Sequence, residues 1–258
     1  MLLENKNAVI YGAGGSIGGA VARAFAREGA RVFLASRTLA TLDKVAEDIR
    51  SAGGAVETAQ VDALDERAVD GYVDAVVEKA GGIDISFNLI SYEDVQGTPL
   101  AQMPLEDFER PIMNAVRTQF LTSRAAARHM ISQGSGVILF FGGAGGRDPI
   151  RDFMSGGFQI YLGGFQVALG AIDVLRRQLA VELGPHGIRV VTLQSGGVPE
   201  TTREDWREAI TQSFDETSML KRVETLEDVA NVAAFAASDL ARTMTATDIN
   251  ITAGRVAD

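Results

Sequence analysis

A glycine-rich segment near the N-terminus has the composition and position of a phosphate-binding turn. Residues 12–18 read Gly-Ala-Gly-Gly-Ser-Ile-Gly, directly after the apolar run 8–11 and before an amphipathic stretch. Glycines let a backbone approach a pyrophosphate closely, and the free N–H groups of the following helix point at the anion. An ordinary structural turn is the alternative. The position after a first strand favours a nucleotide site made by Gly12, Gly14, Gly15, Ser16, Ile17 and Gly18.

The end of the second apolar run, 31–36, indicates which nucleotide binds. An acidic residue at this place binds a ribose diol and repels a 2′-phosphate. The sequence instead has Ser36 and Arg37, and a guanidinium forms charge-assisted hydrogen bonds with phosphate. We therefore expect NADP(H) rather than NAD(H), with a surface arginine that caps the next helix as the alternative.

Two further segments carry a family resemblance across nearly the whole chain. The spacing Gly12-x-x-x-Ser16-x-Gly18 resembles the TGxxxGxG turn of the short-chain dehydrogenase/reductase family, with Tyr11 in place of the threonine. Residues 182–190, ELGPHGIRV, and 226–231, LEDVAN, resemble the second half of the same family. The resemblance implies an oxidoreductase that transfers a hydride to or from a nicotinamide cofactor.

The resemblance also implies cofactor contacts outside the turn. Asp62 matches the aspartate that hydrogen-bonds the adenine, and as a helix N-cap for the stretch from Ala63 it would have a compatible role. The family's Asn-Asn-Ala-Gly is here Asn88-Leu89-Ile90-Ser91, and Gln194–Val198 replaces its Pro-Gly segment. The implied contacts are Asp62, Ala63, Asn88, Gly196, Val198 and Thr201 or Thr202.

The catalytic residues that the resemblance leads us to expect are largely missing. Aligned without gaps, the tyrosine position is Phe165, the lysine position is Leu169 and the serine position is Gly142. Tyrosine, with a pKa near ~10, needs a neighbouring cation to act as an acid at neutral pH. The asparagine that holds a water relay in the family remains, as Asn114.

Tyr161 is the one tyrosine near the missing pair. It precedes Phe165 by one helical turn and would share its helix face. A cation would have to come from Arg147 or Arg151, and Ser155 would polarise a carbonyl. We keep two hypotheses for Tyr161, an acid or substrate contact and an aromatic side chain that lines an apolar pocket.

The segment before Tyr161 is unusually apolar for a loop. Its large side chains predict either a pocket for a bulky hydrophobic substrate or a subunit interface, and they are Phe153, Met154, Phe158 and Ile160. Residues 196–220 resemble the family's substrate lid, although a surface helix with one buried stripe has the same pattern.

Short apolar runs alternate with longer amphipathic stretches along the chain. Strands are expected at 8–11, 31–36, 56–61, 83–88, 137–141, 188–194 and 248–252. Helices are expected at 17–28, 39–52, 63–80, 105–133, 160–183 and 225–240. This alternation predicts the α/β class, a single-domain Rossmann-like doubly wound parallel sheet of about seven strands with helices on both faces. We expect one NAD(P)-binding domain over residues 1–258, because no linker or repeat interrupts it.

The composition excludes several classes of protein. The net charge is −10, so nucleic acid and anionic membranes are improbable partners. The chain has no cysteine and two histidines, which argues against disulfides and against a metal site. The apolar runs are too short for a membrane span, and no signal peptide is evident. We expect a soluble, cytoplasmic protein.

The leading interpretation is an NADP(H)-dependent oxidoreductase with a non-standard active site, acting on a bulky hydrophobic carbonyl or an activated enone. The alternative is a catalytically silent NADP(H)-binding protein that acts as a sensor or a partner subunit. The resemblance further implies a homo-oligomer, a dimer or a homotetramer, in which the helices 105–133 and 160–183 pair between subunits.

Overall fold

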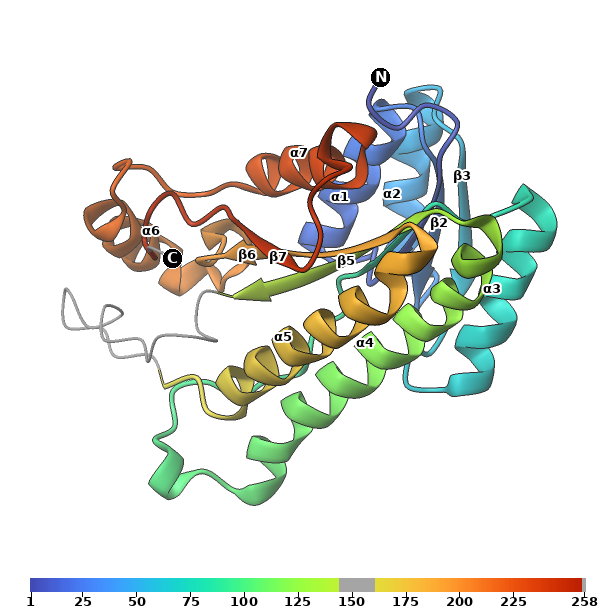
Figure 1. Ribbon diagram of the computed structural model, residues 1–258. Coiled ribbons are helices and arrows are strands. Elements are labelled where there is room, and N and C mark those ends of the chain that lie inside the picture. Colours follow the sequence, from blue (N-terminus) through green and yellow to red (C-terminus); the bar gives the residue numbers. More distant parts are fainter. Residues whose placement is uncertain (144–160, 257–258) are drawn as a thin grey trace.

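The computed structural model describes residues 1–143 and 161–256, and these form a sheet of seven parallel strands in the order β3-β2-β1-β4-β5-β6-β7 (Figure 1). The strands are β1 (Asn7–Tyr11), β2 (Arg31–Ser36), β3 (Val56–Gln60), β4 (Ile85–Asn88), β5 (Gly136–Gly143), β6 (Ile188–Ser195) and β7 (Thr247–Asn250). The sheet confirms the predicted Rossmann-like fold.

Helices cover both faces of this sheet, as Figure 1 shows. The helices are α1 (Ser16–Arg27), α2 (Ala40–Ser51), α3 (Glu66–Ala80), α4 (Leu105–Gln133), α5 (Gly164–Leu183), α6 (Glu204–Thr217) and α7 (Leu226–Ala237). Of these, α1, α2 and α7 pack together on one face, and α3, α4 and α5 pack on the other. Short 3₁₀ turns lie at Leu100–Gln102, Gly184–His186, Pro199–Thr201 and Asp239–Ala241.

The central strand β1 is buried from Ala8 to Tyr11 because each of its faces meets a helical layer. In β1, Ala8 and Ile10 belong to the core under α1, α2 and α7, whereas Val9 and Tyr11 belong to the core under α3, α4 and α5. Successive side chains of a strand point to opposite faces. A strand with helices on both faces therefore does not show the alternation of apolar and polar residues that is typical of a half-exposed strand.

The strand order places a crevice beside β1. After β1 the chain adds β2 and then β3 on one side, and it then returns to add β4 on the other side of β1. In open parallel sheets, ligands bind outside the carboxyl ends of the strands at such a reversal point. The residues that follow β1, β2 and β4 therefore surround the expected site.

The helix α5 begins at Gly164, four residues later than the pattern predicts. Gly163 has a φ of 53°, and a Cβ atom on Gly164 would lie 1.9 Å from the carbonyl oxygen of Phe108. A residue with this positive φ cannot lie inside a right-handed helix, so α5 cannot extend back through Gly163. The close contact with α4 then sets where the new helix starts.

Two other elements differ from the predicted pattern. The helix α3 starts at Glu66 because Asp65 accepts hydrogen bonds from the backbone N–H groups of Arg67 and Ala68, so Asp62 is not its N-cap. Residues 196–220 contain α6, whose buried side chains are Ile210 and Phe214. A helix with one buried stripe fits both the lid interpretation and the surface-helix interpretation of this segment.

Candidate functional site

The glycine turn follows β1 at the bottom of the crevice. Gly12 has a φ of 72°, and its backbone N–H donates to the carbonyl oxygen of Ala35 at 2.9 Å. A Cβ atom on Gly12 would lie 2.5 Å from the carbonyl oxygen of Leu89, and one on Gly18 would lie 2.3 Å from the carbonyl oxygen of Gly12. Both positions therefore accept glycine alone.

The start of α1 fits the phosphates of a dinucleotide. Gly15 precedes the helix and is exposed, and no side chain caps the first N–H groups. Ser16 is exposed and Ile17 packs on the core, so the turn presents backbone donors rather than bulk. A Cβ atom on Gly14 would lie 2.2 Å from Oγ1 of Thr41, so there is no room for a side chain at this position of the turn. The turn thus satisfies the requirements of an anion site at a helix N-terminus.

The end of β2 carries a guanidinium that already has a partner. Arg37 donates from Nη2 to Oε1 of Glu93 at 2.7 Å. The Ser36 hydroxyl accepts from the backbone N–H of Thr38 at 3.3 Å and lies 3.3 Å from Oγ1 of Thr41. Ser36 and Arg37 thus lie together, as the sequence predicts, but the acidic residue opposite them was not anticipated.

Asp62 shapes the chain after β3. Its Oδ1 accepts from the backbone N–H of Leu64 at 3.0 Å, and its side chain is exposed. Ala63 is buried behind it. The other carboxylate oxygen of Asp62 would accept a hydrogen bond from an adenine bound at this place.

Asn88 ends β4 and uses its amide to hold the strand end. Oδ1 accepts from the backbone N–H of Ile90 at 3.0 Å, and Nδ2 donates to Oγ1 of Thr122 at 3.3 Å. The side chain is buried. A cofactor would therefore meet the backbone of this segment, and the Asn88 side chain would position that backbone.

The expected catalytic positions are packed with apolar groups. Leu169 is buried, and a Cβ atom on Gly143 would lie 3.0 Å from its Cδ1. A Cβ atom on Gly142 would lie 3.0 Å from Cγ2 of Thr192. Phe165 packs against the same core. The described contacts at these three positions are therefore with apolar groups.

A buried tyrosine that sequence analysis missed lies behind Phe165. The rings of Tyr92 and Phe165 are 6.1 Å apart, and the Tyr92 hydroxyl donates to the carbonyl oxygen of Phe141 at 3.4 Å. Burial raises the pKa of Tyr92 to about 12, although a hydrogen bond from Gln119 opposes the shift. A hydroxyl with this pKa and a backbone acceptor supports the site rather than delivering protons.

Asn114 and Tyr161 lie on different elements. Asn114, on α4, donates from Nδ2 to the carbonyl oxygen of Tyr92 at 3.2 Å. Tyr161 precedes α5, so it does not share a helix face with Phe165 as predicted, because Gly163 turns the chain between them. Its carbonyl oxygen accepts from the backbone N–H of Gly97 at 2.8 Å. The other residues proposed around Tyr161 lie outside the described residues, and they are Arg147, Arg151, Phe153, Met154, Ser155, Phe158 and Ile160.

The segment after β6 is held by a buried acid that sequence analysis also missed. Glu224 accepts from the Ser195 hydroxyl, and its Oε1 lies 2.7 Å from the donating backbone N–H of Gly197. Burial raises the pKa of Glu224 to about 7, against the opposing effect of these hydrogen bonds and of Arg255. No sequence signal distinguished Glu224 from a surface glutamate.

The predicted contacts Gly196, Val198 and Thr201 lie in this same segment. Arg255 donates from Nη1 to the carbonyl oxygen of Gly196 at 2.5 Å, and Val198 is buried. The Thr201 hydroxyl donates to the carbonyl oxygen of Val198 at 2.8 Å. The segment is therefore a tight turn, supported from behind by Glu224 and Arg255.

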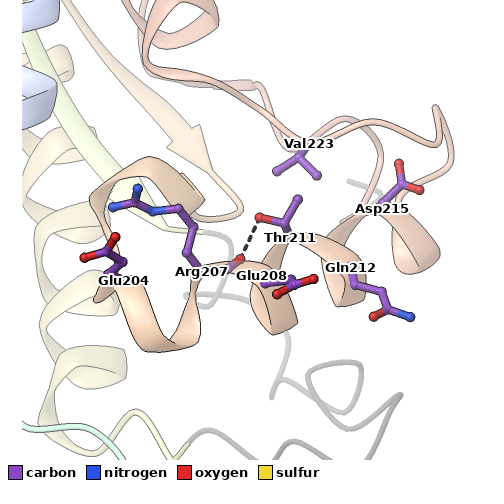
Figure 2. Close-up of a pocket in the computed structure, with 7 residues that line it drawn as sticks. All are labelled: Glu204, Arg207, Glu208, Thr211, Gln212, Asp215 and Val223. Atoms are coloured by element: carbon purple, nitrogen blue, oxygen red, sulfur yellow. Dashed lines mark hydrogen bonds between the residues drawn. The ribbon is translucent and has the colours of Figure 1, made fainter.

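A separate hollow along α6 is not the cofactor site. Figure 2 shows that most of its lining side chains come from α6. The hollow has a volume of about 670 Å³. Its lining has three acidic side chains and one basic side chain, so it carries a net negative charge that disfavours phosphates. The lining residues are Glu204, Arg207, Glu208, Thr211, Gln212, Asp215 and Val223.

Residues 1–143 and 161–256 have neither a cluster of metal-ligating side chains nor a membrane-spanning helix. Within these ranges no three histidine, cysteine, aspartate or glutamate side chains are grouped so that they would hold a metal ion. In the same part of the chain, no helix is long and apolar enough to span a membrane.

Known proteins match this chain from the glycine turn to the last strand. A family model described as enoyl-(acyl carrier protein) reductase matches residues 12–255. An uncharacterized oxidoreductase of Bacillus subtilis is 30% identical over 263 residues, which cover 99% of this chain and 92% of the relative. The crystal structure of a short-chain type dehydrogenase/reductase from Mycobacterium marinum has a TM-score of 0.86 and 30% identity, covering 99% of this chain and 97% of that one. An NAD⁺-bound xylitol dehydrogenase has a TM-score of 0.82 and 25% identity, covering 97% and 99%.

The raised pKa of Glu224 predicts a pH-dependent stability. With a pKa of about 7 in the folded protein, Glu224 should stay protonated to higher pH than in the unfolded chain, where a glutamate has its ordinary pKa of 4.5. Stability should therefore fall as the pH rises from about 4.5 to about 7 and then level off. Glu224→Gln should remove on the order of 1–3 kcal/mol of this decline.

Urea unfolding of both proteins at several pH values between 5 and 8 measures the difference. Glu227→Gln removes an exposed carboxylate from the first turn of α7 and controls for charge alone. Parallel stability curves for the wild type and Glu224→Gln would contradict the prediction.

Proposed function

This chain belongs to the short-chain dehydrogenase/reductase family, whose members bind a nicotinamide cofactor, and we propose that it is an NADP(H)-dependent oxidoreductase without the usual proton-transfer groups. We further propose that it reduces a bulky hydrophobic carbonyl or an activated enone. The domain is taken as residues 1–258, with residues 196–220 as the substrate lid.

The observation that carries the cofactor proposal is the position of Arg37 at the carboxyl end of β2. The glycine turn and the uncapped start of α1 provide backbone donors for a pyrophosphate, and Arg37 provides a cation at the ribose side. The similar xylitol dehydrogenase is described with NAD⁺. The choice between the two cofactors thus depends on the residues after β2.

We expect the residues around the reaction site to bind the substrate and exclude water rather than to transfer protons. The nicotinamide supplies the hydride when the cofactor is bound. Leu169 and Phe165 form an apolar floor that excludes water, and Gly142 adds no hydroxyl. Asn114 keeps its amide on the Tyr92 backbone, and Tyr161 is the remaining side chain that we propose as a proton donor.

An apolar floor without a strong acid favours a particular kind of substrate. A product anion that is stabilised by conjugation needs less protonation than a simple alkoxide. The family model that matches residues 12–255 is described by reduction of enoyl compounds, which are conjugated in this way. The comparisons do not favour the silent-binder alternative.

The exposed face of α4 and α5 supports a homo-oligomer. Val167, Val174 and Val181 recur at heptad spacing on α5, and Met113 and Phe120 are exposed on α4. The apolar outer faces of two packed helices are more stable when buried against a second copy of the same helix pair than when exposed to water. We propose a dimer or tetramer built through this face.

Arg37→Ala should weaken NADPH binding by about 1.5–3 kcal/mol, the range for a hydrogen bond to a charged group. NADH binding should change little, because NADH has no 2′-phosphate. Calorimetric titration of both cofactors measures the difference. Arg50→Ala removes the same charge from an exposed position at the end of α2 and should leave both affinities unchanged. Equal affinities of the wild type for the two cofactors would sink the proposal.

The wild type should reduce activated enones faster than simple ketones by at least about 10²-fold, since general acid catalysis is typically worth ~10²- to 10⁴-fold. NADPH consumption over a panel of both substrate types measures this ratio. If Tyr161 is the donor, Tyr161→Phe lowers kcat and leaves cofactor affinity unchanged. Tyr92→Phe is the matched control, and it should lower stability rather than kcat because its hydroxyl is buried.

Two results of this assay would overturn the proposal. Rapid reduction of ordinary ketones would mean that a strong acid is present at the site. No turnover of any substrate, despite tight NADPH binding, would favour the silent binder.

Val174→Glu should shift the protein to a smaller species, because a carboxylate buried in an apolar interface is strongly disfavoured. Light scattering at micromolar concentration measures the mass of each variant. Ala75→Glu adds the same charge to an exposed site on α3 and should leave the mass unchanged. A monomeric wild type would contradict the proposed assembly.

A further inference from the structure

An ion pair connects the two sides of the dinucleotide crevice. Arg37 follows β2 and Glu93 follows β4, and β1 lies between these two strands. Neighbouring strands are about 4.8 Å apart, so the ends of β2 and β4 are separated by about 10 Å across β1. The contact of 2.7 Å between the two side chains therefore crosses above the carboxyl end of β1, where the glycine turn begins.

The backbones at both ends of this ion pair are held in place. Glu93 has a φ of 59°, an unfavourable value for a residue with a side chain, and its N–H donates to the Ser91 hydroxyl at 3.3 Å. The carbonyl oxygen of Arg37 accepts from Nε2 of Gln60 at 2.9 Å. Strained backbone of this kind concentrates at binding sites and switch regions.

Glu93 and the 2′-phosphate of the expected cofactor would compete for the guanidinium of Arg37. A phosphate monoester carries about −1.5 to −2 charges at neutral pH and would seek the same guanidinium that Glu93 holds. If both anions contacted Arg37 at once, they would repel each other at close range. The side chains of Arg37 and Glu93 are 61% and 44% exposed, and a pair this exposed is weak enough for a phosphate to displace.

We propose that Glu93 is a specificity-determining residue for the cofactor. Its carboxylate holds Arg37 across the crevice of the free protein, and a 2′-phosphate binds only by taking Arg37 from it. Glu93 thereby weakens NADP(H) binding and narrows the preference for NADP(H) over NAD(H). This inference rests on the proposed use of NADP(H).

The test is calorimetric titration of NADPH and NADH into purified wild type and Glu93→Gln at low ionic strength. Glutamine keeps the size of the side chain and removes its charge. We expect NADPH to bind about 3- to 10-fold more tightly to Glu93→Gln, with NADH changed by less than about twofold.

Asp94→Asn is the matched control. Asp94 lies in the same segment, but its carboxylate accepts from Nε2 of Gln96 rather than from Arg37. It should reproduce only the long-range effect of removing one negative charge, which is small across solvent. A gain in NADPH affinity as large as that of Glu93→Gln would overturn the proposal.

The double variant Arg37→Ala/Glu93→Gln tests whether the effect passes through Arg37. In the Arg37→Ala background, the Glu93 substitution should give no more than the change seen for Asp94→Asn. A full gain without Arg37 would mean direct repulsion of the cofactor and would overturn the proposed competition. Weaker NADH binding to Glu93→Gln with NADPH unchanged would instead make Glu93 a ribose ligand, which also overturns it.

The outcomes separate this inference from the proposed function. Equal wild-type affinities for the two cofactors, with no loss in Arg37→Ala, would defeat the NADP(H) proposal itself. A clear preference for NADPH that falls in Arg37→Ala but is unaffected by Glu93→Gln would defeat the role of Glu93 alone.

Discussion

The close approach of two backbone segments at Gly12 is the constraint on which the cofactor region depends. The Gly12 N–H is bonded to β2, the Leu89 N–H donates to the carbonyl oxygen of Tyr11 at 3.0 Å, and no Cβ atom fits at Gly12. Hydrogen bonds thereby join the carboxyl ends of β1, β2 and β4 at the same level of the sheet. The start of α1 directly behind this level places backbone donors at the crevice. Arg37 and Glu93 meet across β1 because their strands end at this same level.

The apolar residues at the expected catalytic positions form a mutually packed set. Leu169 occupies the space over Gly143, and the ring of Phe165 lies tilted beside that of Tyr92. The Tyr92 hydroxyl is in turn satisfied by Gln119 and by the Phe141 carbonyl oxygen. Among the described neighbours of Leu169 and Phe165, a polar side chain would meet mainly apolar groups, and an unpaired polar group is costly in a buried site. The proposed departure from the family pattern would therefore involve several packed residues rather than one.

Two acids contribute to the site in different ways because their surroundings differ. Glu93 is exposed, so its interaction with Arg37 is readily exchanged for another anion. Glu224 is buried beneath the segment after β6, where desolvation raises its pKa despite hydrogen bonds from the Ser195 hydroxyl and from two backbone N–H groups. The first acid can respond to a ligand, and the second holds the backbone turn of Gly196 and Gly197 in a fixed shape.

The sequence alone determined the sheet, the glycine turn and the cation after β2, because each depends on residues adjacent in the chain. The apolar run 8–11 and the glycines at 12 and 18 are local signals of this kind. Tertiary structure decided where α5 begins, because the contact of Gly164 with Phe108 joins two helices. It also decided the partners of Arg37 and Ser195, which are Glu93 and Glu224. Such partners lie far along the chain and meet only through the strand order, so no spacing in the sequence reveals them.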